Sequence, residues 1–268
     1  MKYLSFDSFQ KGLKTKTFGR SFLALSRATS TNDVAFNLIH QGALEGTVIA
    51  AEEQTKGRGR QGRRWTQTPG KGLAFSVILR PRMGMIEAAG VTLAAGVAAA
   101  KTLEDFGLKP RIKWPNDLLL NGKKVCGILT EMGPKKDKMG SVVLGIGVNL
   151  NQTKRDFPGE IKSTATSVYL SSGKKTNRVR FFQRLLLHLE ESYGWLAEDR
   201  FSKVLAEWRK REDSLNRQVK VTQSRRVFYG QAVGLDERGA LLVRNDSGIV
   251  ETVHSGDVVM LKSKIMRR

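Results

Sequence analysis

The segment from Glu52 to Trp65 constrains this chain most, because it places three glycines, four arginines and a tryptophan between two apolar stretches. Those stretches, residues 47–51 and 73–79, have the apolar and β-branched character of buried strands. Glycine lets a backbone approach a ligand closely, and each arginine offers a charged fork of donors for carboxylate or phosphate oxygens. The segment therefore predicts an ordered or ligand-ordered loop that binds an anion.

Two other interpretations of this loop remain open from its residues alone. A basic run of glycine and arginine also occurs in disordered RNA-binding segments, and a run of charge is often a solvated surface. The run occurs once in the chain and lies between two predicted strands, which favours the ligand loop.

Composition narrows the class of protein. The chain has 268 residues, of which 40% are hydrophobic and 26% charged, so it is long enough for one large core and a small second domain. No apolar run approaches the ~20 residues that span a bilayer, and the N-terminus lacks the apolar core of a secretory signal, so we expect a soluble, cytoplasmic protein without a membrane segment. The single cysteine, Cys126, excludes an intrachain disulfide framework, and the three histidines lie at no metal-ligand spacing.

The formal net charge of +21 invites a nucleic-acid interpretation, since lysine and arginine drive phosphate binding. The excess is spread along the chain instead of being concentrated in one reader element. Charge spread in this way favours a general attraction to acidic partners. One hypothesis is that it steers an acidic acceptor protein toward this chain. We expect no specific DNA binding.

Periodicity predicts helices and strands along the whole chain. Helices are expected from the cap at Ser30-Thr31 to Gly42, over residues 88–106, from Asn177 to Leu196, and around residues 204–208. Further strands are expected at residues 110–114 and 141–150, and then at 218–222, 227–234, 240–244, 249–253 and 258–261. The last five are short and joined by tight turns, which is typical of a small barrel.

Asn121-Gly122 is the strongest hairpin signal, because both residues tolerate positive φ. This hairpin places Lys113, Asp117 and Lys124 on neighbouring strands. Lys124 interrupts an apolar strand, which is costly unless its ammonium meets an anion or reaches the surface. The residues alone leave both alternatives open.

The sequence lacks the motifs that several common binding and catalytic mechanisms require. Residues 145–150 resemble a dinucleotide fingerprint superficially, but Leu150 stands where the third glycine is needed. No glycine-rich stretch ends in the Gly-Lys-Ser/Thr of a phosphate-binding P-loop, and no nucleophile and base pair indicates a hydrolase. Any chemistry is therefore expected to come from positioning and charge stabilisation.

Five motifs in order closely resemble the biotin protein ligases, also called biotin–[acetyl-CoA-carboxylase] ligases. They are Ala-Thr-Ser-Thr-Asn at 28–32, Gly-Arg-Gly-Arg-x-Gly-Arg-x-Trp at 57–65, Lys-Trp-Pro-Asn-Asp at 113–117, residues 123–131, and Gly-Ile-Gly-Val-Asn-Leu at 145–150. The resemblance covers about residues 25–262. It implies an α+β fold: a mixed β-sheet catalytic domain flanked by helices (residues 1–215, like class II synthetases and biotin–lipoate ligases), then a small C-terminal SH3-like β-barrel (residues 216–268).

The resemblance implies ligation in two half-reactions. Biotin attacks the α-phosphate of MgATP to give biotinoyl-5′-AMP, and a lysine of a biotin carboxyl carrier protein, such as an acetyl-CoA carboxylase subunit, then displaces AMP. Because charge builds on phosphate oxygens, the catalytic residues are expected to be cations: Arg58, Arg60, Lys113 and Lys124. The glycine-rich loop is expected to be mobile without ligand and to order over the adenylate, keeping water out.

Site residues follow from the family pattern. Those implied to bind biotin are Ser30, Thr31, Asn32, Gln54, Gly57, Arg58, Gly59, Arg60, Lys124 and Gly127. Those implied to bind ATP are Arg60, Arg63, Trp65, Lys113, Asn116, Asp117 and Asn149, with Trp65 covering the adenine. Asp117 is also implied to hold Mg²⁺ through the phosphates.

Three alternatives belong beside this interpretation. They are a lipoate–protein ligase, a basic nucleic-acid-binding protein, and a silent module that binds a carrier without catalysis. Some family members carry an N-terminal DNA-binding domain and act as repressors. The 29 residues before Ser30 have no pattern for one, so we expect a monofunctional ligase; the resemblance leaves a homodimer open.

Overall fold

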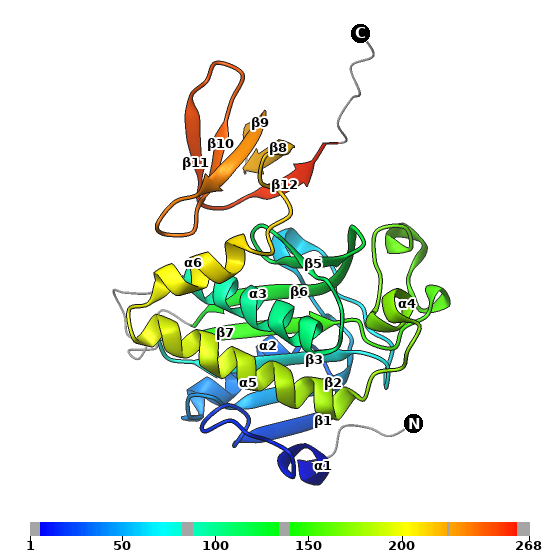
Figure 1. The fold of residues 1–268 in the computed structure, drawn as a ribbon. Coiled ribbons are helices and arrows are strands. Elements are labelled where there is room, and N and C mark those ends of the chain that lie inside the picture. The colour runs from blue at the N-terminus through cyan, green and yellow to red at the C-terminus, as the bar shows by residue number, and fades with distance from the viewer. Residues whose placement is uncertain (1–5, 82–87, 134–139, 224–225, 262–268) are drawn as a thin grey trace.

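The structure, a computed structural model, describes residues 6–81, 88–133, 140–223 and 226–261. Its larger part is a seven-stranded sheet with the order β1-β2-β3-β7-β6-β5-β4 (Figure 1). The strands are β1 (Phe22–Ala28), β2 (Val48–Gln54), β3 (Leu73–Leu79), β4 (Arg111–Lys113), β5 (Asp117–Leu120), β6 (Lys123–Met132) and β7 (Val142–Val148). Strands β1 and β2 pair in parallel and the other neighbours pair antiparallel, which confirms the predicted mixed sheet.

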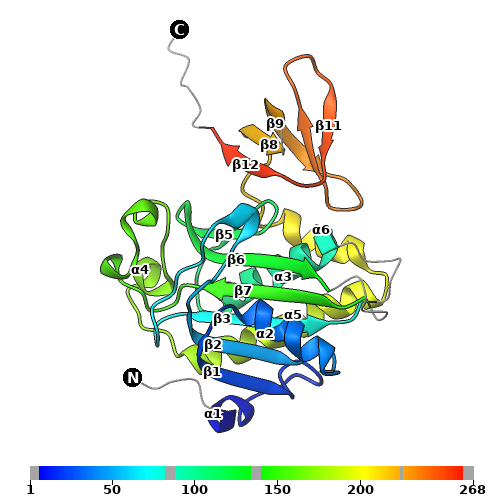
Figure 2. The same cartoon turned by 180° about the vertical axis from the view of Figure 1, so that it is seen from behind.

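Helices cover both faces of this sheet. Helices α3 (Ala88–Asp105), α5 (Arg178–Ala197) and α6 (Phe201–Arg209) lie on the face toward the viewer in Figure 1, and α2 (Thr31–His40) lies on the other face, seen in Figure 2. The shorter helices are α1 (Phe6–Gln10), α4 (Val168–Ser172) and the 3₁₀ turns η1 (Arg60–Gly62), η2 (Lys154–Asp156) and η3 (Gly159–Ile161). The alanines of α3 permit close packing against the buried stripe of α5.

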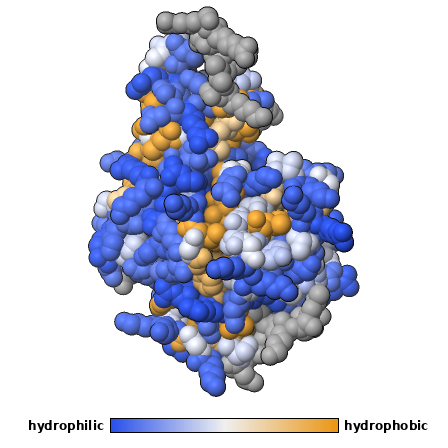
Figure 3. All heavy atoms as spheres, turned by 45° about the vertical axis from the view of Figure 1, so that its right-hand side comes forward, coloured by the Kyte–Doolittle hydropathy of each residue, from blue (hydrophilic) through white to orange (hydrophobic). Residues whose placement is uncertain are grey.

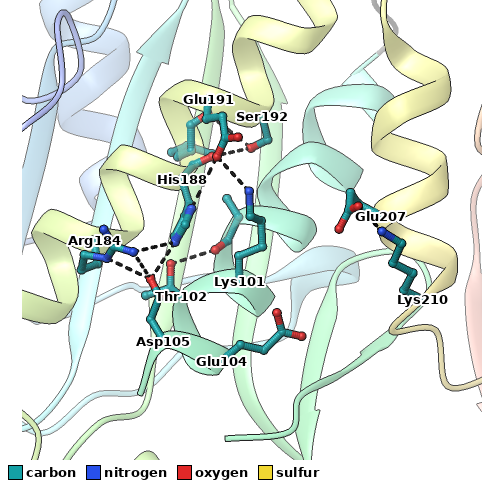
Figure 4. Close-up of polar contacts among 12 residues, drawn as sticks. Lys101, Thr102, Glu104, Asp105, Arg184, His188, Glu191, Ser192, Glu207 and Lys210 are labelled. Atoms are coloured by element: carbon teal, nitrogen blue, oxygen red, sulfur yellow. Dashed lines mark hydrogen bonds and ion pairs between the residues drawn. The ribbon is translucent and has the colours of Figure 1, made fainter. Parts of the chain in front are cut away.

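Polar contacts join α3 and α5 beside their apolar interface (Figure 4). Asp105 accepts hydrogen bonds from Arg184 Nε at 2.9 Å and lies 2.8 Å from His188 Nε2, while Lys101 donates to Glu191 at 2.8 Å. These hydrogen bonds hold the pKa of the Asp105 carboxyl below its usual range, although partial burial opposes the shift. His188 therefore belongs to a contact between helices α3 and α5.

The element boundaries largely agree with the sequence analysis. Helix α2 ends where Gly42 takes φ +82°, and the Asn121-Gly122 turn has positive φ at both residues. Ser30 occupies the N-cap position of α2, but its side chain makes no capping hydrogen bond, so the expected hydroxyl cap is wrong at this residue. Helix α1 and the edge strand β1 were not predicted from the sequence.

The C-terminal part forms a second, five-stranded antiparallel sheet with the order β11-β10-β9-β8-β12. Its strands are β8 (Gln218–Gln223), β9 (Arg226–Leu235), β10 (Leu241–Arg244), β11 (Val250–Val253) and β12 (Asp257–Met260). All five predicted strands are therefore present. The closure of this sheet into an SH3-like barrel and the domain boundary at residue 216 remain predictions, and residues 224–225 and 262–268 lie outside the described ranges.

A buried ion pair between Arg178 and Glu52 holds the backbone of the segment that follows the glycine-rich loop. Arg178, at the start of α5, donates from Nη2 to Glu52 Oε2 at 2.7 Å and from Nε to the Gly72 carbonyl at 2.9 Å. The same Glu52 oxygen accepts from the Gly70 backbone at 2.9 Å. The side chains of Arg178 and Glu52 are only 8% and 4% exposed, so neither charge is solvated by bulk water.

The N-terminal segment packs on the larger part of the protein, since Phe9, Leu13 and Phe18 are buried in its core. None of the helices in the described ranges is long and apolar enough to cross a bilayer.

Candidate active site

A cavity of about 1060 Å³ lies where the start of α2, the glycine-rich loop and the ends of β4 to β7 meet. Of the sixteen residues that the sequence analysis assigned to ligands, all except Gly57 line it. They are Ser30, Thr31, Asn32, Gln54, Arg58, Gly59, Arg60, Arg63, Trp65, Lys113, Asn116, Asp117, Lys124, Gly127 and Asn149. The fold thus brings together residues that are up to 119 positions apart in the sequence.

Neutral polar groups line the end of the cavity at the start of α2. Ser30, Thr31 and Asn32 are each 3% exposed. Gln54 Oε1 accepts from the Thr31 backbone N–H at 2.8 Å, which satisfies a free N–H of the first helical turn. Ser76 on β3 donates to Thr31 Oγ1 at 2.7 Å. This uncharged end suits a neutral ligand that offers both donors and acceptors.

Asn32 is held by a carboxylate that the sequence analysis did not assign. Its Nδ2 donates to Glu131 Oε2 at 2.6 Å. A Cβ atom at Gly145 would lie 2.4 Å from Asn32 Oδ1, so only glycine leaves room for the amide at this point of β7.

The glycine-rich loop folds as a short hairpin over the cavity. Arg58 and Arg64 form a β-bridge, Gly59 N–H donates to the Arg63 carbonyl at 2.7 Å, and Trp65 N–H donates to the Gly57 carbonyl at 2.9 Å. A Cβ at Gly57 would lie 2.5 Å from the Trp65 carbonyl oxygen, so Gly57 permits the close strand crossing and contacts the hairpin instead of the cavity.

Arg58 and Arg60 have different surroundings. Arg58 Nη1 lies 2.6 Å from Asp33 Oδ1 and its Nη2 lies 3.2 Å from Glu131 Oε2, and these contacts raise the pKa of Arg58 although burial opposes them. Among the residues that the structure describes, Arg60 donates to the neutral Asn116 Oδ1 at 3.4 Å and forms no ion pair, and burial lowers its pKa although the charge of Asp117 opposes this. Arg60 therefore keeps a poorly solvated charge in the cavity, while the charge of Arg58 is already neutralised.

Two lysines and one aspartate meet at the β4, β5 and β6 side of the cavity. Lys124 Nζ lies 2.5 Å from Asp117 Oδ1, which confirms that this ammonium meets an anion. Burial lowers the pKa of Lys113, and the charges of Lys124 and Arg63 lower it further, while Asp117 opposes them. The cavity as a whole is lined by six lysines and arginines and by three carboxylates, so it has an excess of positive charge that suits a polyanion.

Lys124 reaches this position through an irregularity in β6. Leu118 pairs with Cys126 but Leu119 pairs with Lys124, so Val125 has no partner on β5 and forms a β-bulge. In a regular strand, residues 124 and 127 would point to opposite faces. Because of the bulge, Lys124 points to the same face of the sheet as Gly127. A Cβ atom added at Gly127 would lie 3.0 Å from Lys124 Cε.

Trp65 lies on the floor of the cavity, against two strand glycines that pair across β6 and β7, Gly127 and Gly147. A Cβ at Gly147 would be 2.2 Å from Trp65 Cε2, and one at Gly127 would be 3.1 Å from Cζ3. Lys124 Nζ lies 5.8 Å from the centre of the indole ring. The indole Nε1 is buried without a hydrogen-bond partner among the described residues, which leaves it available to a ligand.

The two asparagines of the nucleotide prediction are already engaged. Asn149, 4% exposed, donates from Nδ2 to the Thr166 carbonyl at 3.0 Å and accepts from Gln152 at 3.2 Å. Asn116 donates to the Ile128 carbonyl at 2.8 Å and accepts from Arg60. Both amides therefore organise the cavity wall.

The C-terminal sheet completes the cavity. Arg63 forms an ion pair with Asp257 at the start of β12, and residues 257–260 line the cavity. Trp114 on the large sheet donates from Nε1 to the Gly239 carbonyl at 3.1 Å. The sequence analysis gave Asp33, Glu131, Gly145, Gly147 and Asp257 no role, since their partners are distant in sequence.

Comparisons with known protein families agree with this geometry. Residues 24–149 match the biotin/lipoate A/B protein ligase family, and residues 214–261 match the biotin protein ligase C-terminal domain.

Individual proteins are similar over most of the chain. A bifunctional ligase/repressor of Bacillus subtilis is 37% identical over 256 residues, which cover 95% of this chain and 78% of the relative. A biotin–[acetyl-CoA-carboxylase] ligase of Mycobacterium tuberculosis is 32% identical, covering 91% of this chain and 90% of the relative. A solved biotin protein ligase of Aquifex aeolicus, in complex with biotin and ATP, superimposes with a TM-score of 0.79 at 31% identity, covering 91% of this chain and 100% of that one.

Proposed function

This chain belongs to the biotin protein ligase family, and from that membership we propose how its own residues activate biotin and pass it to a carrier protein. The enzyme couples ATP to biotin activation and transfer, and neither a lipoate ligase nor a nucleic-acid-binding protein is favoured. The observation that carries the assignment of roles is the division of one cavity into a neutral polar end and a cationic end.

The neutral end is proposed to bind the ureido ring of biotin. A urea offers two N–H donors and one carbonyl acceptor without net charge, which matches the hydroxyls and amides of Thr31, Asn32 and Gln54. Ser30 lies beside them at the same helix start. The strand glycines Gly127 and Gly147 let the indole of Trp65 lie directly on the β6 and β7 backbone, and we propose that the flat ring of the ligand lies next to this indole.

The cationic end is proposed to hold the reacting groups. With the ureido ring at α2, the biotin carboxylate points toward Lys124, which exchanges its contact with Asp117 for a biotin oxygen. Lys113, Arg60 and Arg63 then face the phosphates of ATP. Because burial already disfavours the charged forms of Lys113 and Arg60, an added phosphate stabilises them, and they in turn stabilise the charge that builds on phosphorus oxygens during attack.

Arg58 is proposed to position the site indirectly. It joins Asp33 of α2 to Glu131 of β6, and Glu131 holds Asn32. A direct contact with the adenylate would require Arg58 to exchange one carboxylate for the ligand. Gly59 lets the hairpin lie close over whatever occupies the cavity.

The residues at the cationic end fit a magnesium ion bound through phosphates. Magnesium takes oxygen ligands and is usually held by one or two carboxylates together with substrate phosphates. Asp117 is the carboxylate that would hold it, beside the amide of Asn116. When bound, the ion would neutralise charge on the phosphates; the chain's own residues orient them.

The proposed acceptor is a lysine of a biotin carboxyl carrier protein, and the proposed location is the cytoplasm, where a buried free thiol such as Cys126 is the usual state of cysteine. Mass spectrometry of a purified carrier domain incubated with this protein, biotin and MgATP tests the function. A single added biotinoyl group on one lysine is expected. An unmodified carrier and no released pyrophosphate would contradict the proposal.

Arg60→Ala is expected to shorten the retention of biotinoyl-AMP. The side chain lies in the hairpin over the cavity and forms no ion pair within the described ranges. Its removal takes away one charged contact to the adenylate phosphate, worth about 1.5–3 kcal/mol, or roughly a 10- to 150-fold faster release. Release of radiolabelled biotinoyl-AMP measures this. Lys56→Ala, an exposed residue of the same loop outside the cavity, serves as the control, and equal lifetimes for both variants would contradict the role.

Gly147→Ala is expected to weaken biotin binding. Its methyl group would overlap the Trp65 ring, and since the β7 backbone is paired on both sides, the indole must move. Overpacking of this kind costs about 1–3 kcal/mol, or roughly 5- to 150-fold in Kd by calorimetry. Gly96→Ala in α3 is the control, since its Cβ meets Ile112 at an ordinary 3.7 Å. Unchanged biotin affinity for Gly147→Ala would show that Trp65 does not shape the pocket.

A further inference from the structure

A second, smaller cavity of about 230 Å³ lies beside the first, and the function described above makes no use of it. Phe157 and Ala165 line both cavities, so the two share a wall. Three lysines, Lys123, Lys154 and Lys162, surround the smaller cavity. None of them lines the larger one.

The three lysines carry unneutralised charge. All three are exposed, and within the described ranges none has a carboxylate within 4.0 Å. Two acidic residues, Asp156 and Glu160, lie between Lys154 and Lys162 in the sequence. Asp156 is already engaged, because Lys71 Nζ lies 2.6 Å from it and Thr153 donates to it from its backbone and its hydroxyl; these contacts lower the pKa of Asp156 to about 2, although burial opposes them. Glu160 is exposed, lines the larger cavity, and forms no ion pair with the three lysines within the described ranges.

Besides the lysines, the smaller cavity is lined by the apolar residues Leu120, Phe157, Ala165 and Leu170 and by the polar residues Asn121, Thr166 and Ser171. Leu170 of α4 lines the cavity and remains 36% exposed, and Ile161 on the adjoining rim is 37% exposed. Figure 3 looks onto the side of the molecule that carries α4 and shows apolar surface in the middle of this side, surrounded by hydrophilic residues. An exposed apolar area with a charged rim is typical of a protein contact.

The backbone links this surface directly to the catalytic lysine. Lys124 N–H donates to the Thr164 carbonyl at 2.8 Å, and Thr166 N–H donates to the Lys124 carbonyl at 2.9 Å. The segment that separates the two cavities is therefore paired with β6 at the residue proposed to meet the biotin carboxylate. Anything bound in the smaller cavity lies next to the reacting end of the larger one.

We propose that this lysine-rimmed cavity docks the carrier protein, by taking an apolar side chain and surrounding carboxylates from the face that presents the acceptor lysine. This inference rests on the proposed function. The second half-reaction must bring a cationic lysine of another protein to a cavity that is itself positive, so the acceptor face needs carboxylates to offset the repulsion. The three lysines around the smaller cavity, Lys123, Lys154 and Lys162, can form ion pairs with these carboxylates.

The test uses the full chain with Lys154 and Lys162 both changed to Glu. Neither residue belongs to the larger cavity, so pyrophosphate release with biotin and MgATP is expected to stay within about twofold of wild type. Discharge of preformed biotinoyl-AMP to hydroxylamine, a small amine, is expected to be equally unaffected. With a purified biotin carboxyl carrier domain as acceptor, KM is expected to rise at least tenfold while kcat changes little.

A matched variant, Lys11→Glu with Lys14→Glu, makes the same change of net charge on exposed lysines that follow α1 at the β1 edge of the sheet. It is expected to change KM for the carrier less than threefold. Lys154→Gln with Lys162→Gln is expected to give an intermediate rise and carries the test if the glutamate variant does not fold. A carrier with one surface carboxylate reversed to lysine is expected to lose affinity for wild type and to regain part of it with the glutamate variant.

Each other outcome contradicts the proposal in its own way. An equal rise in KM for both double variants would mean general charge steering without a docking site. Slower pyrophosphate release or slower discharge to hydroxylamine would place the lysines in the nucleotide site. An unchanged KM would place the carrier elsewhere. Wild-type protein that forms no biotinoyl-AMP would overturn the proposed function itself, and this inference with it.

Discussion

Replacing Lys124 by Met is expected to lower the rate of biotinoyl-AMP formation by about 10²- to 10³-fold, the usual cost of losing one preorganised group that stabilises developing charge. Methionine keeps the apolar stem of the side chain but removes the ammonium that lies 2.5 Å from Asp117. The biotin carboxylate would then meet an unpaired aspartate instead of a cation. Pyrophosphate release under saturating biotin and MgATP measures the effect.

The neighbouring Lys123→Met provides the matched control, because this exposed lysine lies outside the larger cavity. It should form the adenylate at nearly the wild-type rate. Lys124→Arg restores the charge with a different shape and should recover part of the loss. A Lys124→Met enzyme with a rate within threefold of wild type would exclude this lysine from the chemistry.

Arg178→Ala is expected to destabilise the fold by about 3–5 kcal/mol, since it leaves the Glu52 carboxylate buried without its cation. The arginine is 8% exposed and also donates to the Gly72 carbonyl, so the substitution removes two contacts that water cannot easily replace. The midpoint of urea unfolding, followed by circular dichroism, reports the loss. The slope of the transition should stay constant.

Arg27→Ala is the control for this prediction. Arg27 pairs with Glu53 at 3.6 Å, but the two side chains are 67% and 43% exposed, and such surface pairs contribute about 0–1 kcal/mol. The double change Arg178→Met with Glu52→Gln removes both charges and should recover much of the stability. If Arg178→Ala and Arg27→Ala shift the unfolding midpoint equally, burial of the ion pair does not determine how much stability its loss removes.

Local patterns in the sequence predict much of this fold. The Asn121-Gly122 turn, the alanine-rich helix α3 and the five short C-terminal strands each follow from periodicity and turn residues within a short window. The residues around the cavity were predicted by resemblance of motifs, and fifteen of the sixteen line it. For Lys124 the residues alone left a bound anion and a surface position both open, and only the family resemblance assigned the lysine to the site.

Other features depend on segments that meet only in the folded chain. Glu131 holds both Asn32 and Arg58 across separations of 99 and 73 residues, and no local pattern predicts those contacts. Asp257 reaches the loop from the second sheet. The edge strand β1 has only half-buried and exposed residues and pairs in the described sheet with β2 alone, so its pattern in the sequence is weak.

The bulge at Val125 means that the spacing between the lysine and the glycine of this strand is set together with the backbone geometry. Flattening the bulge without removing a residue would turn Lys124 to the face opposite Gly127, whereas deleting Val125 would place Lys124 two residues before Gly127, where regular alternation keeps both on one face. A homologue shortened by one position there should therefore not be treated as inactive merely because its lysine aligns out of step with Lys124.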